Sequence, residues 1–289
     1  MKLSLMFMFL FTSTVWAKWS VTTYNIRNFD KDPMSGRTDL AEFARIIQAN
    51  KSDVIAFQEV VDVKALKKMI NDQLPNYSSQ VTSCGGTAKQ KIALAYNQEK
   101  FEFVKRTEDR SFSGGQGSNG CGSLRPVLVV DLRLKETNEI YTFGVVHLKA
   151  GGSRKDFEKR WKQYGGLKHL SDRYTNKNLI LLGDFNSTGY SLKDDDYVSF
   201  ENFITQASMR TVSENLGCTS YWRGTLGGEE WQSSILDHIV IQEKNLSAVT
   251  DIRVGTHCER MNCRPGTREE LGLSFKSVSD HCPIQVTFK

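Results

Sequence analysis

A short apolar run, followed at once by glycine and two polar residues, constrains the fold of this chain more than any other stretch. Residues 178–187 read Asn-Leu-Ile-Leu-Leu-Gly-Asp-Phe-Asn-Ser. The four apolar residues are too few for a helix and are bounded by turn formers, so they predict a buried strand. Residues two apart on an extended chain point the same way, so we expect Asp184 and Asn186 to project together. Such a pair suits holding a hydrated cation or orienting a water, although it also favours an Asx turn.

The first 17 residues have the pattern of a processing segment. Lys2 gives a positive start, residues 3–11 are almost unbroken apolar sequence, and Val15 and Ala17 are small residues before a cut. This apolar region is too short to span a bilayer. We therefore expect a secretory signal peptide over residues 1–17, one domain over residues 18–289, and a secreted protein, extracellular or periplasmic. A retained membrane anchor is the alternative.

Six cysteines follow the expected signal peptide, and an even number in an oxidising compartment favours disulfides. We expect Cys84 and Cys121 to pair, because both lie in glycine-rich loops that flank neighbouring strands. Cys258 and Cys263 with His257 are an alternative zinc site, but no second ligand pair follows at zinc-finger spacing. The formal net charge of +5 is compatible with an anionic partner without requiring one.

Alternating strand and helix patterns indicate an α/β fold. Residues 19–26 are rich in β-branched and aromatic residues and predict a strand. Residues 39–50 have helical spacing with Asp39 as a cap, and residues 53–58 predict a second buried strand, so at least part of the sheet should be parallel or mixed. Further helices are predicted at 63–74 and before 178, and further strands at 91–96, 127–134, 140–147, 219–223, 235–241, 248–254 and 283–288. We expect two sheets packed face to face with helices outside.

Polar residues stand at the ends of several of these apolar strands. A buried acid at a strand end is costly unless it is paired or bound to a metal, so several of them predict a shared pocket at one edge of the sheets. Carboxylates that hold a cation, with a histidine held by an aspartate, suit metal-assisted phosphodiester hydrolysis. We expect His281 to be functional and His169, His238 and His257 to be structural. The strand-end residues are Asn25, Arg27, Gln58, Glu59, His147, Asp237, His238, Asp280 and His281.

Six short segments resemble the endonuclease/exonuclease/phosphatase superfamily, and within it the deoxyribonuclease I-like secreted nucleases. They are residues 23–27 (Thr-Tyr-Asn-Ile-Arg), 57–60 (Phe-Gln-Glu-Val), 146–148 (Val-His-Leu), 182–186 (Leu-Gly-Asp-Phe-Asn), 236–237 (Leu-Asp) and 279–283 (Ser-Asp-His-Cys-Pro). The segments follow the family's order along nearly the whole chain. This resemblance implies a four-layer α/β/β/α sandwich of two packed mixed sheets with outer helices. It also implies a divalent metal, Mg²⁺ first, with Mn²⁺ or Ca²⁺ as alternatives.

The resemblance also assigns roles by matching position. It implies that Glu59 is the main metal ligand, with Asn25 and Asp280 nearby. His281, oriented by Asp237, is implied to activate water. By the same resemblance, Asp184 and Asn186 orient the nucleophile and the phosphate. His147 is implied to contact the scissile phosphate and to protonate the leaving oxygen, and Arg27 is implied to contact a phosphate. One departure is that residues 89–93 contain no glutamate to support His147, as the deoxyribonuclease has.

The stretch after His147 bears on the substrate. If residues 154–164 are helical, Phe157, Trp161 and Tyr164 share a buried face, and basic residues cover the rest until Gly165 and Gly166 end the helix. These charges suit a polyanion backbone, with a solvated helix face as the alternative. The basic residues are Lys149, Arg154, Lys155, Lys159, Arg160 and Lys162.

We therefore predict a secreted, metal-dependent nuclease with little sequence preference. Its expected partner is DNA, with RNA left open, and we expect a monomer without stable membrane association. A sphingomyelinase or phospholipase C-type phosphodiesterase is the first alternative; it would expose apolar side chains, for which Tyr221, Trp222 and Trp231 are the candidates. A non-catalytic or toxin-like binding module is the second.

Overall fold

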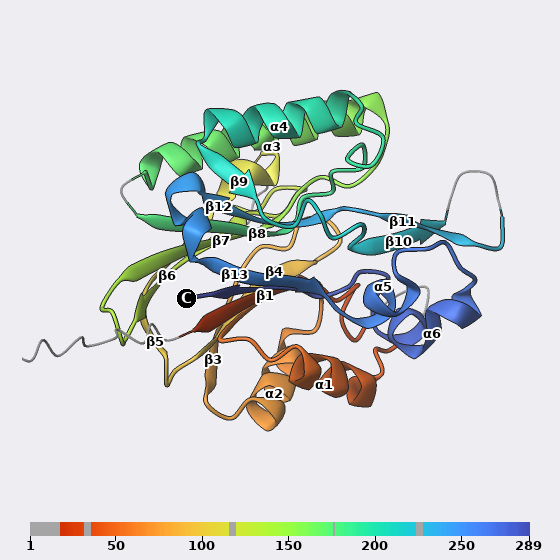
Figure 1. The fold of residues 1–289 in the computed structure, drawn as a ribbon, viewed down its shortest axis with the longest axis horizontal. Coiled ribbons are helices and arrows are strands. Elements are labelled where there is room, and N and C mark those ends of the chain that lie inside the picture. Colours follow the sequence, from red (N-terminus) through yellow and green to blue (C-terminus); the bar gives the residue numbers. More distant parts are fainter. Residues whose placement is uncertain (1–17, 32–35, 116–119, 176, 224–227) are drawn as a thin grey trace, which may run out of the picture.

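The structure is a computed structural model, and it describes residues 18–289 apart from 32–35, 116–119, 176 and 224–227. The expected signal peptide, residues 1–17, lies outside the described residues. Two six-stranded sheets form the centre of the molecule (Figure 1). The first has the strand order β13 (Val249–Val254), β14 (Ile284–Phe288), β1 (Trp19–Asn25), β2 (Val54–Val60), β4 (Lys91–Asn97) and β3 (Tyr77–Val81).

The second sheet has the order β5 (Phe101–Asp109), β6 (Val127–Leu134), β7 (Ile140–His147), β8 (Asn178–Asp184), β12 (Asp237–Gln242) and β9 (Met209–Thr211). Each sheet contains one parallel pair, β1 with β2 and β7 with β8, and is otherwise antiparallel. The expected crossover from the first to the second predicted strand is thus confirmed. A separate two-stranded ribbon joins β10 (Ser220–Arg223) to β11 (Trp231–Ser234).

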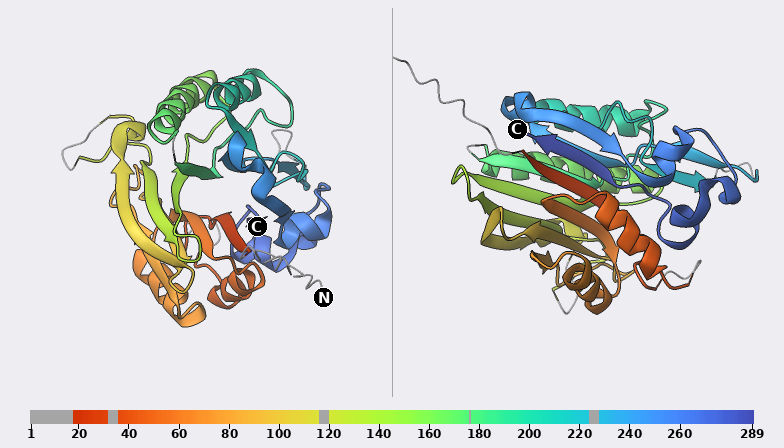
Figure 2. Two further views of the ribbon diagram at one scale, coloured as in Figure 1. Left: turned by 60° about the vertical axis from the view of Figure 1, so that its left-hand side comes forward. Right: turned by 60° about the horizontal axis from the view of Figure 1, so that its bottom comes forward.

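Apolar side chains from both sheets fill the space between them. Val21 and Leu94 of the first sheet belong to the same buried cluster as Val145 and Ile239 of the second. The outer face of the first sheet packs against α1 (Leu40–Ala49) and α2 (Val63–Gln73), and that of the second against α3 (Arg154–Arg173) and α4 (Asp195–Gln206). Figures 1 and 2 show the resulting order of helices, sheet, sheet and helices, which confirms the predicted α/β sandwich of two mixed sheets.

Local sequence explains where several helices begin. Asp39 caps α1 by accepting the N–H groups of Ala41 and Glu42, as predicted. A reciprocal capping box between Ser153 and Asp156 starts α3. Two short helices, α5 (Thr256–Met261) and α6 (Arg268–Ser277), precede the last strand, and two 3₁₀ turns, η1 (Arg110–Ser113) and η2 (Glu243–Ala248), follow β5 and β12. The sequence analysis missed β3, β5, β9, β11, α4, α5 and α6.

The prediction that Gly165 and Gly166 end the third helix is wrong, because α3 continues to Arg173. Gly166 faces the ring of Phe112, and a Cβ at this position would lie 2.9 Å from that ring. Glycine therefore permits a close approach of helix and loop, and tertiary packing outweighs its low helix propensity.

Three disulfides join the six cysteines. Cys84 pairs with Cys121, which confirms the expected bridge, and Cys218 pairs with Cys263 and Cys258 with Cys282. Because Cys258 and Cys263 are both bridged, they offer no thiolate to zinc, and the zinc alternative is wrong. Within the described ranges, no helix has both the length and the apolar character needed to cross a membrane.

Candidate active site

Three titratable residues form a row across neighbouring strands of the second sheet, at the side where β7 and β8 end and β12 begins. His147 ends β7 opposite Asp184, which ends β8, and Asp184 in turn lies opposite Asp237, which begins β12. The Nε2 atom of His147 lies 3.4 Å from Oδ2 of Asp184. Because residues in register project to the same side of a sheet, the pairing of the strands is what brings these three side chains together.

Gly183 makes the approach of β7 to β8 feasible at this edge. Its φ of +139° is one that other residues rarely adopt, and a Cβ there would lie 2.1 Å from the carbonyl oxygen of Val146. A side chain would therefore push the two strands apart just before His147 and Asp184. Packing of the two strands therefore requires glycine at position 183.

The first sheet contributes Asn25 and Glu59 to the same place. Asn25 ends β1, and its Nδ2 donates to Oδ2 of Asp184 at 2.9 Å and to Oε1 of Glu59 at 3.2 Å. The pairing of β2 with β4 is irregular between Phe57 and Val60, and Glu59 has a φ of +61°. This bulge turns the Glu59 carboxylate toward the second sheet. One carboxamide therefore bridges carboxylates from both sheets.

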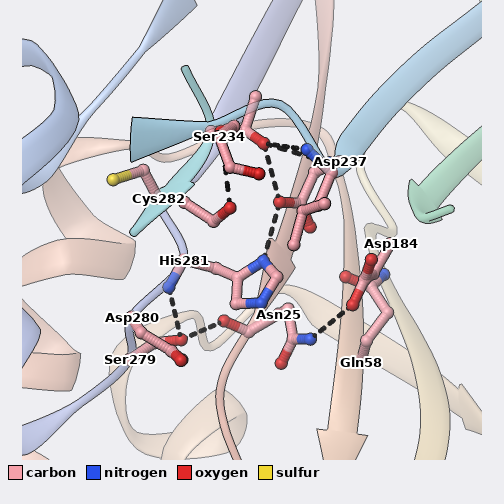
Figure 3. A network of polar contacts seen from close by, with 12 residues as sticks. Asn25, Gln58, Asp184, Ser234, Asp237, Ser279, Asp280, His281 and Cys282 are labelled. Carbon is pink, nitrogen blue, oxygen red and sulfur yellow. Dashed lines mark hydrogen bonds and ion pairs between the residues drawn. The ribbon is translucent and has the colours of Figure 1, made fainter. Parts of the chain in front are cut away.

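His281 reaches the site from the segment before β14. Its Nδ1 lies 2.7 Å from Oδ2 of Asp237, and the same oxygen accepts a hydrogen bond from Thr219 at 2.9 Å. The Ser279 hydroxyl donates to the carbonyl oxygen of Asn25 and accepts the N–H of His281, which ties this segment to β1 (Figure 3). These contacts fix the orientation of the His281 ring. Because Nδ1 contacts Asp237, Nε2 is the nitrogen that can act on another group.

The two histidines of the site have pKa values shifted in opposite directions. Burial alone would lower the pKa of His281, but the charges of Asp237, Asp184 and Asp280 raise it well above 6.5. Burial lowers the pKa of His147 well below 6.5, and the charge of Arg125 lowers it further. His147 is therefore neutral at pH 7, and His281 is the more basic of the two.

The carboxylates of the site fit a divalent cation. Burial and the charge of Asp237 raise the pKa of Asp184 to about 7, and burial and the charge of Asp280 raise that of Glu59. Ligand atoms of Glu59, His147 and Asp184 all lie within 4.8 Å of one another. Buried acids that destabilise each other's charge are stabilised by a cation, and oxygen donors suit Mg²⁺. Asn25 presents its amide nitrogen to these acids, whereas its oxygen accepts the N–H of Arg27.

Arg125 belongs to this site and was missed by the sequence analysis. It is buried just before β6, and its guanidinium donates to the carbonyl oxygens of His147 (3.1 Å) and Leu148. The Nδ1 atom of His147 is buried without a hydrogen-bond partner among the described residues. This agrees with the missing glutamate in residues 89–93. An arginine directly before Pro126 and a strand was the one sequence signal for Arg125.

The expectation that Asp184 and Asn186 project together from an extended chain is wrong. Asn186 has a φ of +51°, and its N–H donates to Oδ1 of Asp184 at 2.8 Å, which is an Asx turn. The Asn186 side chain instead donates to the carbonyl oxygen of Leu148. The turn nevertheless leaves Oδ2 of Asp184 facing Asn25 and His147.

The predicted substrate-binding residues lie in different surroundings. The guanidinium of Arg27 donates to the carbonyl oxygens of Phe275 and Lys276 at the end of α6. Lys149 pairs with Asp156, and Arg154 pairs with Glu158 and Asp195. Lys155 and Lys159 are exposed on α3.

Arg160, expected on the basic surface, is fully buried. It forms an ion pair with Asp196, because an arginine charge that helix packing buries requires a partner. The sequence pattern placed Arg160 on the wrong face of the helix. His238 and His257 are buried as well, and His238 bonds to the hydroxyls of Ser187 and Ser213.

A buried acid–imidazole pair beside clustered carboxylates, at one edge of two packed sheets, defines a phosphoester hydrolase. Residues 22–281 match the model of the endonuclease/exonuclease/phosphatase family, so the chain belongs to this family. Its members hydrolyse ester bonds of phosphates and use divalent metals. Comparison of the sequence with curated proteins gave no match.

Several solved structures share the fold. An endonuclease/exonuclease/phosphatase from Bacteroides vulgatus superposes with a TM-score of 0.67 at 16% identity, over 94% of this chain and 99% of that one. TDP2 of D. rerio, complexed with a single-strand DNA product, has a TM-score of 0.65 at 16% identity, with coverages of 94% and 99%. The human Nocturnin catalytic domain, with a bound sulfate anion, has a TM-score of 0.64 at 17% identity, with 94% of both chains covered.

Proposed function

We propose that this protein is a secreted, divalent-metal-dependent nuclease that hydrolyses phosphodiester bonds of DNA, and of RNA as a second substrate. The observation that carries the proposal is the pairing of His281 with Asp237 beside the partly buried Glu59 and the buried Asp184. Residues 18–289 form its catalytic domain, three disulfides suit an extracellular protein, and the D. rerio TDP2 structure with single-strand DNA offers a related precedent.

In this proposal His281 is the general base. Asp237 accepts the Nδ1 proton and fixes the tautomer, so that Nε2 takes a proton from the attacking water. The charge of Asp237 stabilises the imidazolium that this transfer forms. Asp184, whose second oxygen is held by the Asx turn, orients the nucleophile, with Asn186 beside it.

His147 acts on the leaving side of the phosphate as a neutral hydrogen-bond donor to the leaving oxygen. Its low pKa keeps the ring uncharged before the substrate binds. Arg125 holds the backbone of His147 by donating to its carbonyl oxygen. Glu59, with Asp280 and Asn25 nearby, would hold the cation, which when bound stabilises negative charge on the phosphate oxygens. Because Asn25 now directs its oxygen to Arg27, its amide must turn before that oxygen becomes a ligand. Arg27, Lys149, Arg154, Lys155 and Lys159 are the proposed phosphate contacts.

A lipid phosphodiesterase on the same fold receives less support. Tyr221 is buried, and the Trp231 ring packs against Phe275 with centroids 4.8 Å apart. Of the three aromatic residues considered for membrane docking, only Trp222 is well exposed. A membrane-docking surface requires a contiguous apolar patch, and a single tryptophan does not provide one.

The test offers plasmid DNA, RNA and sphingomyelin vesicles to the purified mature protein, each with Mg²⁺ or with excess chelator. We expect cleavage of the nucleic acids with Mg²⁺ and none with chelator. His281→Ala serves as the inactive control that excludes a contaminating nuclease. Cleavage of sphingomyelin without cleavage of either nucleic acid would refute the nuclease assignment and favour the lipid alternative.

A further inference from the structure

A hollow of about 190 Å³ lies between α3 and η1. Phe112 and Leu124 give it an apolar wall, and Lys159 and Lys162 stand at the same hollow. Gly166 also lines it, so the helix carries no side chain at that point. The hollow thus combines an apolar surface with two cations.

The hollow is on the same edge of the second sheet as the active site. β5 ends at Asp109 opposite the start of β6 at Val127, and β7 ends at His147 on this same side. Gln163 connects the two places directly, because its Nε2 donates to the carbonyl oxygen of Phe112 and its Oε1 accepts the N–H of Lys149. The residue after Leu124 is Arg125, which holds the carbonyl oxygen of His147. Gln163 and Arg125 therefore connect the lining of the hollow to His147 and the segment that follows it.

The cations near the hollow differ from the other cations of this region. Lys155, Lys159 and Lys162 form no ion pair with any described residue, and their spacing of four and three residues puts them on one stripe of α3. The others each form an ion pair: Lys149 with Asp156, Arg154 with Glu158, Arg160 with Asp196, Lys168 with Asp172 and Arg173 with Asp109. The stripe is thus free to bind anions, and it leads to the apolar wall.

We propose that the hollow and the lysine stripe form a subsite for single-stranded nucleic acid. This inference rests on the proposed function and specifies the form of its substrate. An unstacked base contacts Leu124 and the edge of Phe112, while Lys155, Lys159 and Lys162 contact the adjoining phosphates. Apolar contact with bases and cationic contact with the backbone are the two components of single-strand binding. The bases of a duplex are stacked on each other and do not enter the hollow.

The two components are separable by their salt dependence. In the His281→Ala background, which prevents cleavage, binding of a fluorescent 12-nucleotide single strand is measured by anisotropy at several salt concentrations. Lys159→Glu with Lys162→Glu should weaken binding about tenfold near 0.15 M salt and reduce the salt slope by about 1.4. Leu124→Ser should weaken binding about fivefold and leave the salt slope unchanged, because it removes an apolar contact.

Two controls accompany this binding measurement. Lys168→Glu lies on the same helix, away from the hollow, and should behave as the parent protein. The far-ultraviolet circular dichroism spectrum and the melting temperature of each variant should match those of the parent protein, which shows that the fold is intact. An unchanged affinity and slope in the lysine variant, or an equal effect of Leu124→Ser on a 12-base-pair duplex, would overturn the subsite. A parent protein that cleaves lipid only would instead overturn the proposed function.

Discussion

Arg160 and Asp196 form an ion pair in which neither side chain is exposed, with Nη2 of the arginine 2.8 Å from Oδ2 of the aspartate. The same guanidinium donates to the carbonyl oxygens of Lys149 (2.6 Å) and Gly151 (3.1 Å) and to the hydroxyl of Thr188 (2.9 Å). One buried cation therefore joins the segment after His147 to the segment after Asn186. Through this ion pair, α3 and α4 hold the two segments that follow His147 and Asn186 in place.

Replacing Arg160 should destabilise the protein strongly. Arg160→Met leaves the Asp196 charge buried without a partner, so the free energy of unfolding should fall by about 3–5 kcal/mol. The double variant Arg160→Met with Asp196→Leu removes both charges and should recover much of that loss. Urea denaturation monitored by tryptophan fluorescence measures both. A loss below about 1 kcal/mol in the single variant would contradict a structural role for this pair.

The hydrogen bonds around Asp237 predict a graded series of activities. His281→Ala removes the proposed base and should lower kcat by about 10²–10⁴-fold. Thr219→Val removes the hydroxyl that donates to Asp237 and accepts the N–H groups of Leu236 and Asp237, and it should lower kcat by about tenfold, with KM nearly unchanged. Steady-state hydrolysis of bis(p-nitrophenyl) phosphate measures the series. Near-normal turnover by His281→Ala would refute its role as base.

Metal binding should raise the melting temperature of the protein. The acids Glu59 and Asp184 destabilise each other's charge in the buried site, and a bound cation relieves this repulsion. Mg²⁺ should therefore raise the Tm of the parent protein and shift that of Glu59→Gln much less. Glu269→Gln, an exposed residue on α6, is the control and should keep the full shift. Equal shifts in all three proteins would place the cation elsewhere.

Acidification should destabilise the protein in part through His238. Burial lowers the pKa of His238 to about 3, whereas its ordinary value is 6.5. Between these values the unfolded chain binds a proton that the folded protein does not, so stability decreases as the pH falls from 6.5 toward 3. From pH 7 to pH 5 this residue should account for about 2 kcal/mol.

His238→Gln should remove that contribution. Its loss of unfolding free energy between pH 7 and pH 5 should be smaller than that of the parent protein by the amount given above. His169→Gln is the control, because His169 is exposed on α3, and it should leave the pH dependence as it was. Parallel stability curves for the parent and His238→Gln would show that this histidine does not titrate as its burial implies.

Local sequence patterns were sufficient to predict most strands, but not which strands pair with each other in a sheet. The strands at residues 127–134 and 140–147 are found where the sequence predicted them, because apolar and β-branched residues dominate both. β5 was missed because its apolar residues Phe101, Phe103 and Val104 are followed only by polar residues, and most of its side chains are exposed. Arg160 was misplaced for a related reason: helical spacing shows which residues share a face, but not which face a neighbouring helix covers.

The sequence by itself determined the components of this protein: an α/β sandwich, cysteines able to form the Cys84–Cys121 bridge, and acids and histidines at strand ends in the order of a known family. Only the tertiary structure decided that His147, Asp184 and Asp237 lie side by side, because strand register is set by partners far apart in the chain. It also decided that Arg125 supports His147 and that Lys159 and Lys162 border an apolar hollow. Spacing along the chain carries local geometry, whereas contacts between distant segments form only when the sheets pack.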